Sequence, residues 1–76
     1  MSEREWLDIF ADNLVAIMKD RGVTQSQLSD ESGIAESSIS YYIRGLKTPG
    51  IKAIINISYA LDCSVADLVD FGDRIM

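Results

Sequence analysis

The residues of this chain that could make specific polar contacts lie on one face of a short predicted helix over residues 36–44. Their side chains are of moderate length and carry donors or acceptors near their tips: Glu36, Ser37, Ser40, Tyr41 and Arg44. The opposite face carries Ile39, Tyr42 and Ile43 at the i, i+3, i+4 spacing of a face turned toward a core. The chain has no histidine, no glycine-rich phosphate loop and no nucleophile grouped with a base. We therefore expect the polar face to bind a partner, and we do not expect an enzyme.

A second short helix and a tight turn must position that face. Thr24, with Gln27 three residues later, forms a predicted capping box that starts a helix over residues 25–32. Gly33 falls where this helix must end and the backbone must turn through positive φ, which costs glycine little. The stretch 24–45 therefore predicts a helix-turn-helix.

Capping and stop signals place three further helices around this unit. Ser2 with Glu5 and Ser64 with Asp67 have the spacing of two further capping boxes, each of which starts a helix. Gly22 is the C-terminal stop of the first helix. The predicted helices cover residues 3–21, 25–32, 36–44, 51–61 and 64–70. We predict one all-α domain over residues 1–76, a compact five-helix bundle, with a tail at 71–76 to which no structure is assigned.

The pattern resembles the Cro/CI-type helix-turn-helix family of phage repressors and small bacterial regulators. The resemblance spans about residues 7–70 and rests on Gln25, Leu28, Ser29, Gly33, Ile34, Ile39, Gly45 and Pro49, and then on Ala60, Leu61, Val65 and Leu68. Ser29 replaces the alanine usual in the family, Ser32 stands at an often apolar position, and Ala35 replaces the usual Ser or Thr cap of the third helix. The family implies a lambda repressor-like DNA-binding domain.

The resemblance assigns base reading to the first turns of the third helix, where Glu36, Ser37, Ser40 and Tyr41 match. Two interpretations of Glu36 stay open, because its carboxylate could accept from a cytosine amino group or simply favour the positive end of the helix dipole. The serines reach bases only by close approach or through water. With Ala35 unable to cap, the helix could also start late on Glu36 or Ser37, which would remove a base reader.

The resemblance also implies phosphate contacts on both sides of the groove. Gln25 matches the position at the start of the second helix, where its amide and exposed backbone N–H groups suit a phosphate. Arg44, Lys47 and Thr48 end and follow the third helix, and Lys52 lies near the start of the fourth. Each is otherwise a solvated surface residue. Together they imply few phosphate contacts per subunit, and so weaker and less salt-dependent binding than in basic relatives.

The net charge of −5 at first argues against a DNA partner, but the charge is unevenly distributed. All twelve acidic residues lie at or before Glu36, or at or after Asp62. The segment 37–61 contains three basic residues and no acidic one, so its charge is +3 and the remainder sums to −8. Because the Debye length is about 8 Å at physiological salt, acids on the far side are largely screened at the groove. The net charge should still slow association and weaken non-specific binding.

Length and composition exclude several other classes of protein. Seventy-six residues predict one domain of modest stability. A single cysteine and the lack of histidine exclude an intramolecular disulfide and a Cys/His zinc site, and Cys63 is expected to be a small buried hydrophobe. No run of about 18 apolar residues and no signal segment occurs. We expect a cytoplasmic protein with no membrane contact, no cofactor or metal, and no evident small-molecule ligand.

A single recognition helix reads too few bases for specificity, and relatives bind palindromes as twofold dimers. We expect the homodimer contact at Phe71 and Ile75 in the apolar tail. Trp6 and Ile9 form a second candidate patch, or merely lengthen the core.

The leading interpretation is a sequence-specific regulator of transcription that binds double-stranded DNA, a repressor that blocks polymerase at a palindromic operator. If the protein activates instead, Asp30 and Glu31 on the second helix are the surface to test. The alternative is a helix-turn-helix fold used as a protein-interaction module, because the acidic surface discourages DNA. A chain this short has no room for a separate dimerisation or inducer-sensing domain, so it acts alone or is a fragment of something longer.

Overall fold

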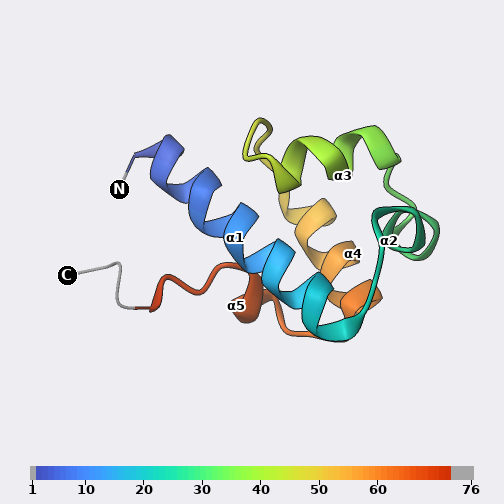
Figure 1. The fold of residues 1–76 in the computed structure, drawn as a ribbon. Helices are drawn as coiled ribbons and strands as arrows, with labels where there is room; N and C mark the ends of the chain where they lie inside the picture. The colour runs from blue at the N-terminus through green and yellow to red at the C-terminus, as the bar shows by residue number, and fades with distance from the viewer. Residues whose placement is uncertain (1, 73–76) are drawn as a thin grey trace.

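Five helices follow one another along residues 2–72, the part of the chain that the computed structural model describes (Figure 1). They are α1 (Glu3–Arg21), α2 (Gln25–Ser32), α3 (Glu36–Ile43), α4 (Ile51–Leu61) and α5 (Val65–Leu68). No strand forms within these described residues. The predicted all-α, five-helix fold is therefore confirmed, and the predicted bounds of α1, α2 and α4 agree with the observed ones.

Three of the helices begin at the capping boxes that the sequence predicts. At the start of α2, the backbone N–H of Gln27 donates to the hydroxyl of Thr24 at 3.1 Å, and the Gln27 side chain accepts from the Thr24 N–H at 2.9 Å. The same reciprocal pair closes the other two boxes: Ser2 with Glu5, and Ser64 with Asp67. Each box satisfies donors that a helix start would otherwise leave unpaired.

α3 begins without any such cap. Ala35 occupies the N-cap position with φ −57° and ψ 139°, and no side chain bonds to the first turn. Glu36 and Ser37 both lie inside the first helical turn, so the alternative in which one of them caps a later start is wrong. The helix ends at Ile43, with Arg44 as its C-cap residue.

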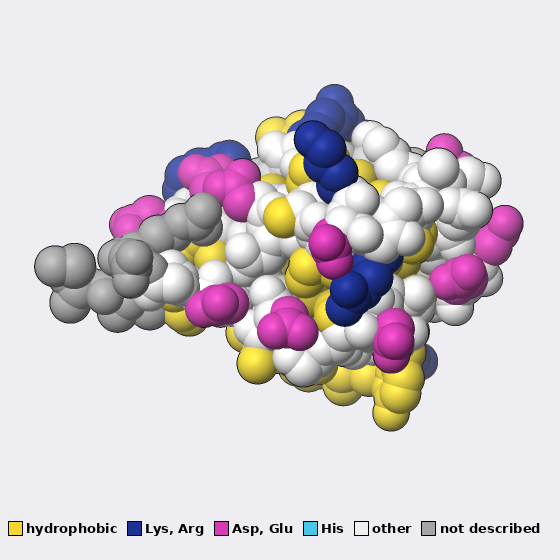
Figure 2. All heavy atoms as spheres, turned by 60° about the horizontal axis from the view of Figure 1, so that its bottom comes forward, with side chains coloured by type: hydrophobic (Ala, Val, Ile, Leu, Met, Phe, Trp, Pro, Cys, Tyr) yellow, Lys and Arg dark blue, Asp and Glu magenta, His cyan; other side chains and the backbone are white. Residues whose placement is uncertain are grey.

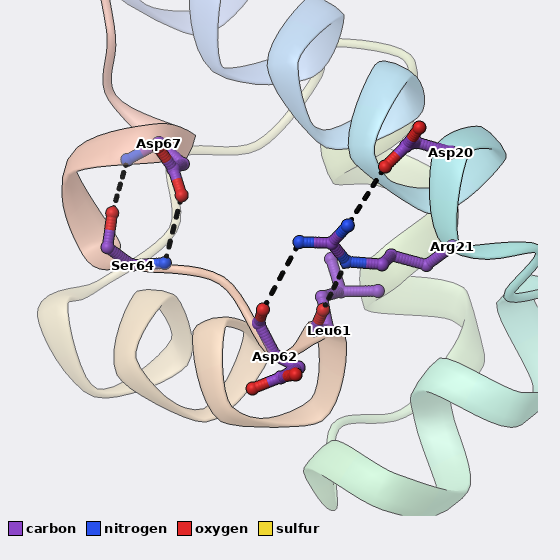
Figure 3. Close-up of polar contacts among 6 residues, drawn as sticks. All are labelled: Asp20, Arg21, Leu61, Asp62, Ser64 and Asp67. Atoms are coloured by element: carbon purple, nitrogen blue, oxygen red, sulfur yellow. Dashed lines mark hydrogen bonds and ion pairs between the residues drawn. The ribbon is translucent and has the colours of Figure 1, made fainter.

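Arg21, the last residue of α1, caps the end of α4 (Figure 3). Its Nε donates to the carbonyl of Leu61 at 3.1 Å, and its Nη2 donates to the carbonyl of Asp62 at 3.3 Å. A cation at this end also interacts favourably with the helix dipole. Asp62 adopts a left-handed conformation with φ 53°, which aspartate tolerates better than most residues. The C-terminal ends of α1 and α4 are thereby joined.

α5 ends at Leu68, so the predicted end near Asp70 is wrong. The reason is a side chain from the middle of α1. Asn13 donates through Nδ2 to the carbonyl of Leu68 at 3.0 Å and to that of Asp70 at 2.9 Å. These carbonyls have partners without a further helical turn.

One apolar core holds the five helices together. Its fully buried side chains include at least one from every helix: Phe10, Leu14, Leu28, Ile39, Ile57, Leu61 and Leu68. Isolated helices shorter than about 12–15 residues are marginal in water, so all of these helices except α1 depend on the shared core. Trp6 stacks on Phe10 with ring centroids 5.5 Å apart, and Ile9 is buried. These two residues therefore lengthen the core and do not form an exposed patch.

The first turns of α1 hold the turn that follows α3. Gly45 is buried with φ +67°, and a Cβ atom there would lie 3.0 Å from Nη2 of Arg4. Arg4 is itself fixed by an ion pair with Asp8 at 2.6 Å, and its hydrogen bond and charge hold the pKa of that carboxyl below its ordinary value. Farther along, the hydroxyl of Thr48 donates to a carboxylate oxygen of Glu3 at 2.8 Å. α1 thereby positions the loop between α3 and α4.

We predict that Gly45→Ala destabilises the protein more than Gly22→Ala. Both glycines have φ +67°, but nothing lies within 4 Å of a Cβ at Gly22. Left-handed strain should cost about 1 kcal/mol at either glycine, and at Gly45 the end of the Arg4 side chain must also shift away from the new methyl group, which adds a smaller cost. The measurement is the free energy of unfolding in urea. In an Arg4→Ala background the difference should disappear, and a difference that persists would contradict the role given to Arg4.

We also predict that Ala35→Ser stabilises the protein by about 1 kcal/mol, because a serine oxygen can accept from the first turn of α3. Ala16→Ser is the control, since Ala16 is exposed in the middle of α1 and serine there should cost up to about 0.5 kcal/mol. Both values come from urea unfolding. Equal changes in the two variants would show that the missing cap does not limit α3.

Candidate nucleic-acid interface

α3 packs one face against α1 and α2 and leaves its opposite face at the edge of the molecule (Figure 1). Ile39 is fully buried and Tyr42 is 5% exposed on the inner face. The predicted base-reading residues lie on the outer face. Three of them, Glu36, Ser37 and Tyr41, are exposed, and Ser40 is half-buried. The structure therefore brings these four side chains together on one accessible helix surface.

Two serines fix the turn that sets the angle between α2 and α3. Gly33 ends α2 with φ 73°. The hydroxyl of Ser29 donates to the carbonyl of Ile34 at 2.6 Å, and the N–H of Ile34 donates to the hydroxyl of Ser32 at 3.2 Å. The two serines that depart from the usual family residues thus satisfy both backbone groups of one turn residue. Sequence reasoning missed this role, and the only signal for it was two serines spaced closely around a glycine.

Arg44 and Tyr41 form a pair at the C-terminal end of the outer face. The guanidinium carbon of Arg44 lies 5.2 Å from the centroid of the Tyr41 ring, a cation–π contact. Both side chains are exposed. An arginine held in this way presents a planar set of donors that suits the oxygens of a phosphate.

Lys47 lies against α3, and Ser38 is the residue that holds it there. The ammonium of Lys47 donates to the hydroxyl of Ser38 at 3.2 Å and lies 5.8 Å from the centroid of the Tyr42 ring. Sequence reasoning gave Ser38 no role. The positive charge of Lys47 therefore lies at the side of α3 that carries Ser38 and Tyr42.

Thr48 differs from the other predicted phosphate contacts. Its hydroxyl proton is already donated to Glu3, and a carboxylate in that place would repel a phosphate. The structure therefore gives Thr48 a part in fixing the loop, and a phosphate that accepts from Thr48 would have to displace the carboxylate of Glu3.

The remaining predicted residues lie around the edges of the domain. Gln25 is the exposed first residue of α2, directly after its cap, and Lys52 is exposed in the first turn of α4. Phe71, predicted for the dimer contact, is half-buried within the monomer. Ile75 lies outside the described residues.

Cys63 is half-buried, less covered than the sequence predicts for a small hydrophobe. Burial raises the pKa of its thiol, and the nearby carboxylate of Asp67 acts in the same direction. The thiol is therefore held in its neutral, less reactive form.

The surface charge follows the uneven distribution seen in the sequence. Among the five helices of the described chain, α4 contains no acidic residue, and Glu36 is the single acid of α3. Figure 2, in which the side that lies lowest in Figure 1 comes forward, shows Asp and Glu side chains at several separate places on that face. At a Debye length of about 8 Å these charges act mainly on what approaches that side. Carboxylates close to the interface include those of Glu36 and Glu3, and that of Asp8, which lies beside Gly45 but is paired with Arg4.

No helix of the described residues is both long and apolar enough to span a membrane.

Comparison with known proteins agrees with this architecture. The family of Cro/C1-type HTH DNA-binding domains matches residues 13–73. The chain is 35% identical over 57 residues to the uncharacterized HTH-type transcriptional regulator YqaE of Bacillus subtilis (strain 168), across 75% of this chain and 49% of that protein. It thus spans about half the length of that relative.

A solved structure is similar over most of both chains. The crystal structure of the restriction-modification controller protein C.AhdI from Aeromonas hydrophila superposes with a TM-score of 0.79 at 26% sequence identity, and the match covers 82% of this chain and 94% of that one. The family match extends over most of the sequence and includes the whole helix-turn-helix. The chain therefore belongs to the family of Cro/C1-type helix-turn-helix DNA-binding domains.

Proposed function

We propose that this chain is a sequence-specific regulator of transcription, a repressor that binds double-stranded DNA as a twofold dimer on a palindromic operator. The observation that carries the proposal is the accessible polar face of α3 in a domain of a DNA-binding family. A helix with its side chains is about 10–12 Å across, and the major groove is about 12 Å wide. The outer face of α3 therefore has the size and the chemistry to enter that groove.

Base contacts come from the two turns of α3. Glu36 and Ser37 lie in its exposed first turn, and Tyr41 extends from its second turn and is 44% exposed. The Tyr41 ring can contact a thymine methyl, and Glu36 can accept from a cytosine amino group. Ser40 is half-buried and short, so it reaches a base through water.

Phosphate contacts come from the ends of the neighbouring elements. Gln25 offers its amide and the N-terminal N–H groups of α2, while Arg44, Lys47 and Lys52 supply three positive charges per subunit. Six such charges in a dimer limit the slope of log affinity against log salt to about −5. A slope this modest means that base contacts have to supply a large share of the affinity.

Repression by occlusion is the simplest mechanism for such a domain, because a bound dimer covers the operator and needs no further activity. The similarity to a transcriptional regulator and to a restriction-modification controller protein supports a regulatory role. The carboxylates of Glu36 and Glu3 at the edge of the interface favour the alternative, a protein-interaction module, because they weaken attraction to phosphates.

The proposal is tested by selecting from a pool of random duplex oligonucleotides and then measuring affinity for the enriched site. We expect a palindrome. Arg44→Glu should lower the affinity at least about tenfold at about 50 mM salt, since it replaces a phosphate donor with a repelling carboxylate. Lys19→Glu is the matched control, because Lys19 is exposed in the last turn of α1 and both variants change the net charge from −5 to −7. Lys19→Glu should change the affinity about twofold or less.

Two results would overturn the proposal. One is the absence of any enriched sequence and of any shift on duplex DNA at low salt. The other is an equal loss of affinity in Arg44→Glu and Lys19→Glu, which would mean that only net charge matters. Tight binding of a protein partner without DNA binding would support the interaction module instead.

A further inference from the structure

α4 carries a row of large apolar side chains that faces solvent. Ile51, Ile55 and Tyr59 follow one another at a spacing of four residues, and they are 68%, 39% and 83% exposed. The inward face of the same helix is buried in the core through other residues: Ile54, Ile57 and Leu61. α4 is therefore apolar on two faces, only one of which is used by the domain itself. We call the exposed row Ile51, Ile55 and Tyr59 the α4 stripe.

Charge restricts what can cover the α4 stripe. Each copy of this chain carries a net charge of −5, so two copies repel one another across most surfaces. Of the five helices in the described residues, α4 is the one that lacks an acidic residue, and its one charged residue is Lys52. A second copy that packs on the α4 stripe therefore meets no carboxylate from α4 itself.

We propose that the α4 stripe is the homodimer contact, with a second copy of this chain as its occupant. In a twofold contact the same surface meets itself, so antiparallel α4 helices place Ile55 near the axis and Ile51 opposite Tyr59 of the partner subunit. Residues spaced by four form the ridges that interlock when two helices cross at about −50°. The inference rests on the proposed function, because it assigns the surface through which the DNA-binding dimer forms.

The area of the α4 stripe sets the strength of the dimer. Its three side chains expose on the order of 400 Å² per copy, about half of what each partner buries in a standard interface. The largest apolar patch on a typical monomer is about 300–600 Å² and is often functional, so the size of the α4 stripe is that of a modest binding surface. The dimer is therefore weak when free, and simultaneous binding to two half-sites stabilises it by mass action.

This contact replaces the one expected from the sequence. The sequence predicts a dimer contact at Phe71 and Ile75. Of these two, Phe71 lies within the described residues, and it is half-buried within the monomer. Tyr59 exposes far more of its ring and lies within an uninterrupted helix. The α4 stripe thus offers more accessible apolar surface to a second copy.

The test is sedimentation equilibrium of the whole chain from about 10 μM to about 1 mM, where a weak dimer dissociates on dilution. The wild type should dimerise within this range. Ile55→Glu places two carboxylates at the axis and should raise the dimer dissociation constant at least about tenfold. Val15→Glu is the matched control, because Val15 is 42% exposed on α1 and the charge change is the same. This control should dimerise like the wild type.

Tyr59→Glu provides a second variant at an 83% exposed position, where the substitution should not disturb the fold. It should also remain monomeric, with unchanged circular dichroism. The inference is overturned if the wild type is monomeric throughout the range, or if Ile55→Glu and Tyr59→Glu dimerise normally while Phe71→Lys does not.

Measurement on DNA separates this inference from the proposed function. Both α4 variants should keep the affinity of the wild type for a single half-site and lose the added affinity for the palindrome. A wild type that dimerises through the α4 stripe but binds no duplex would overturn the proposed function alone. A wild type that binds the palindrome, with α4 variants that still dimerise on it, would overturn only the inference.

Discussion

The burial of α3 against α1 and α2 is the interaction on which the interface depends. An eight-residue helix without a side-chain cap is unstable alone in water, because nucleation fixes several residues for a single hydrogen bond. Ile39 and Tyr42 anchor this helix in the core, and the rings of Phe10 and Tyr42 form a T-shaped pair with a centroid distance of 6.2 Å. The outer face is therefore ordered before a partner arrives, and binding does not have to supply the free energy for ordering it.

One electrostatic constraint accounts for both surfaces that we propose. A phosphate backbone and a second copy of this acidic chain are both negative, so each is attracted most to a surface with few carboxylates. The segment 37–61, which contains no acid, includes most of α3 and all of α4. The acids elsewhere should depress non-specific DNA binding, which is almost entirely electrostatic, more strongly than they depress binding through base contacts.

The sequence predicted most of the fold because helix starts, helix ends and buried faces are encoded within a few neighbouring residues, as at Thr24 and Gly33. It did not predict hydrogen bonds between distant residues. Asn13 reaches a carbonyl 55 positions away and shortens α5, and Arg21 caps a helix 40 positions away. In the interface, periodicity predicted the outer face of α3, but the positions of individual side chains depend on rotamers. The contact of Lys47 with Ser38 could therefore not be predicted from the sequence.

The place of Trp6 has a practical consequence. It is the single tryptophan of the chain, half-buried and stacked at 5.5 Å on Phe10, whose ring also contacts Tyr42 on the inner side of α3. Unfolding transfers its indole from this aromatic cluster to water, which shifts fluorescence emission to longer wavelength. The molecule thus contains a native optical reporter of the packing beneath α3, and no label has to be introduced.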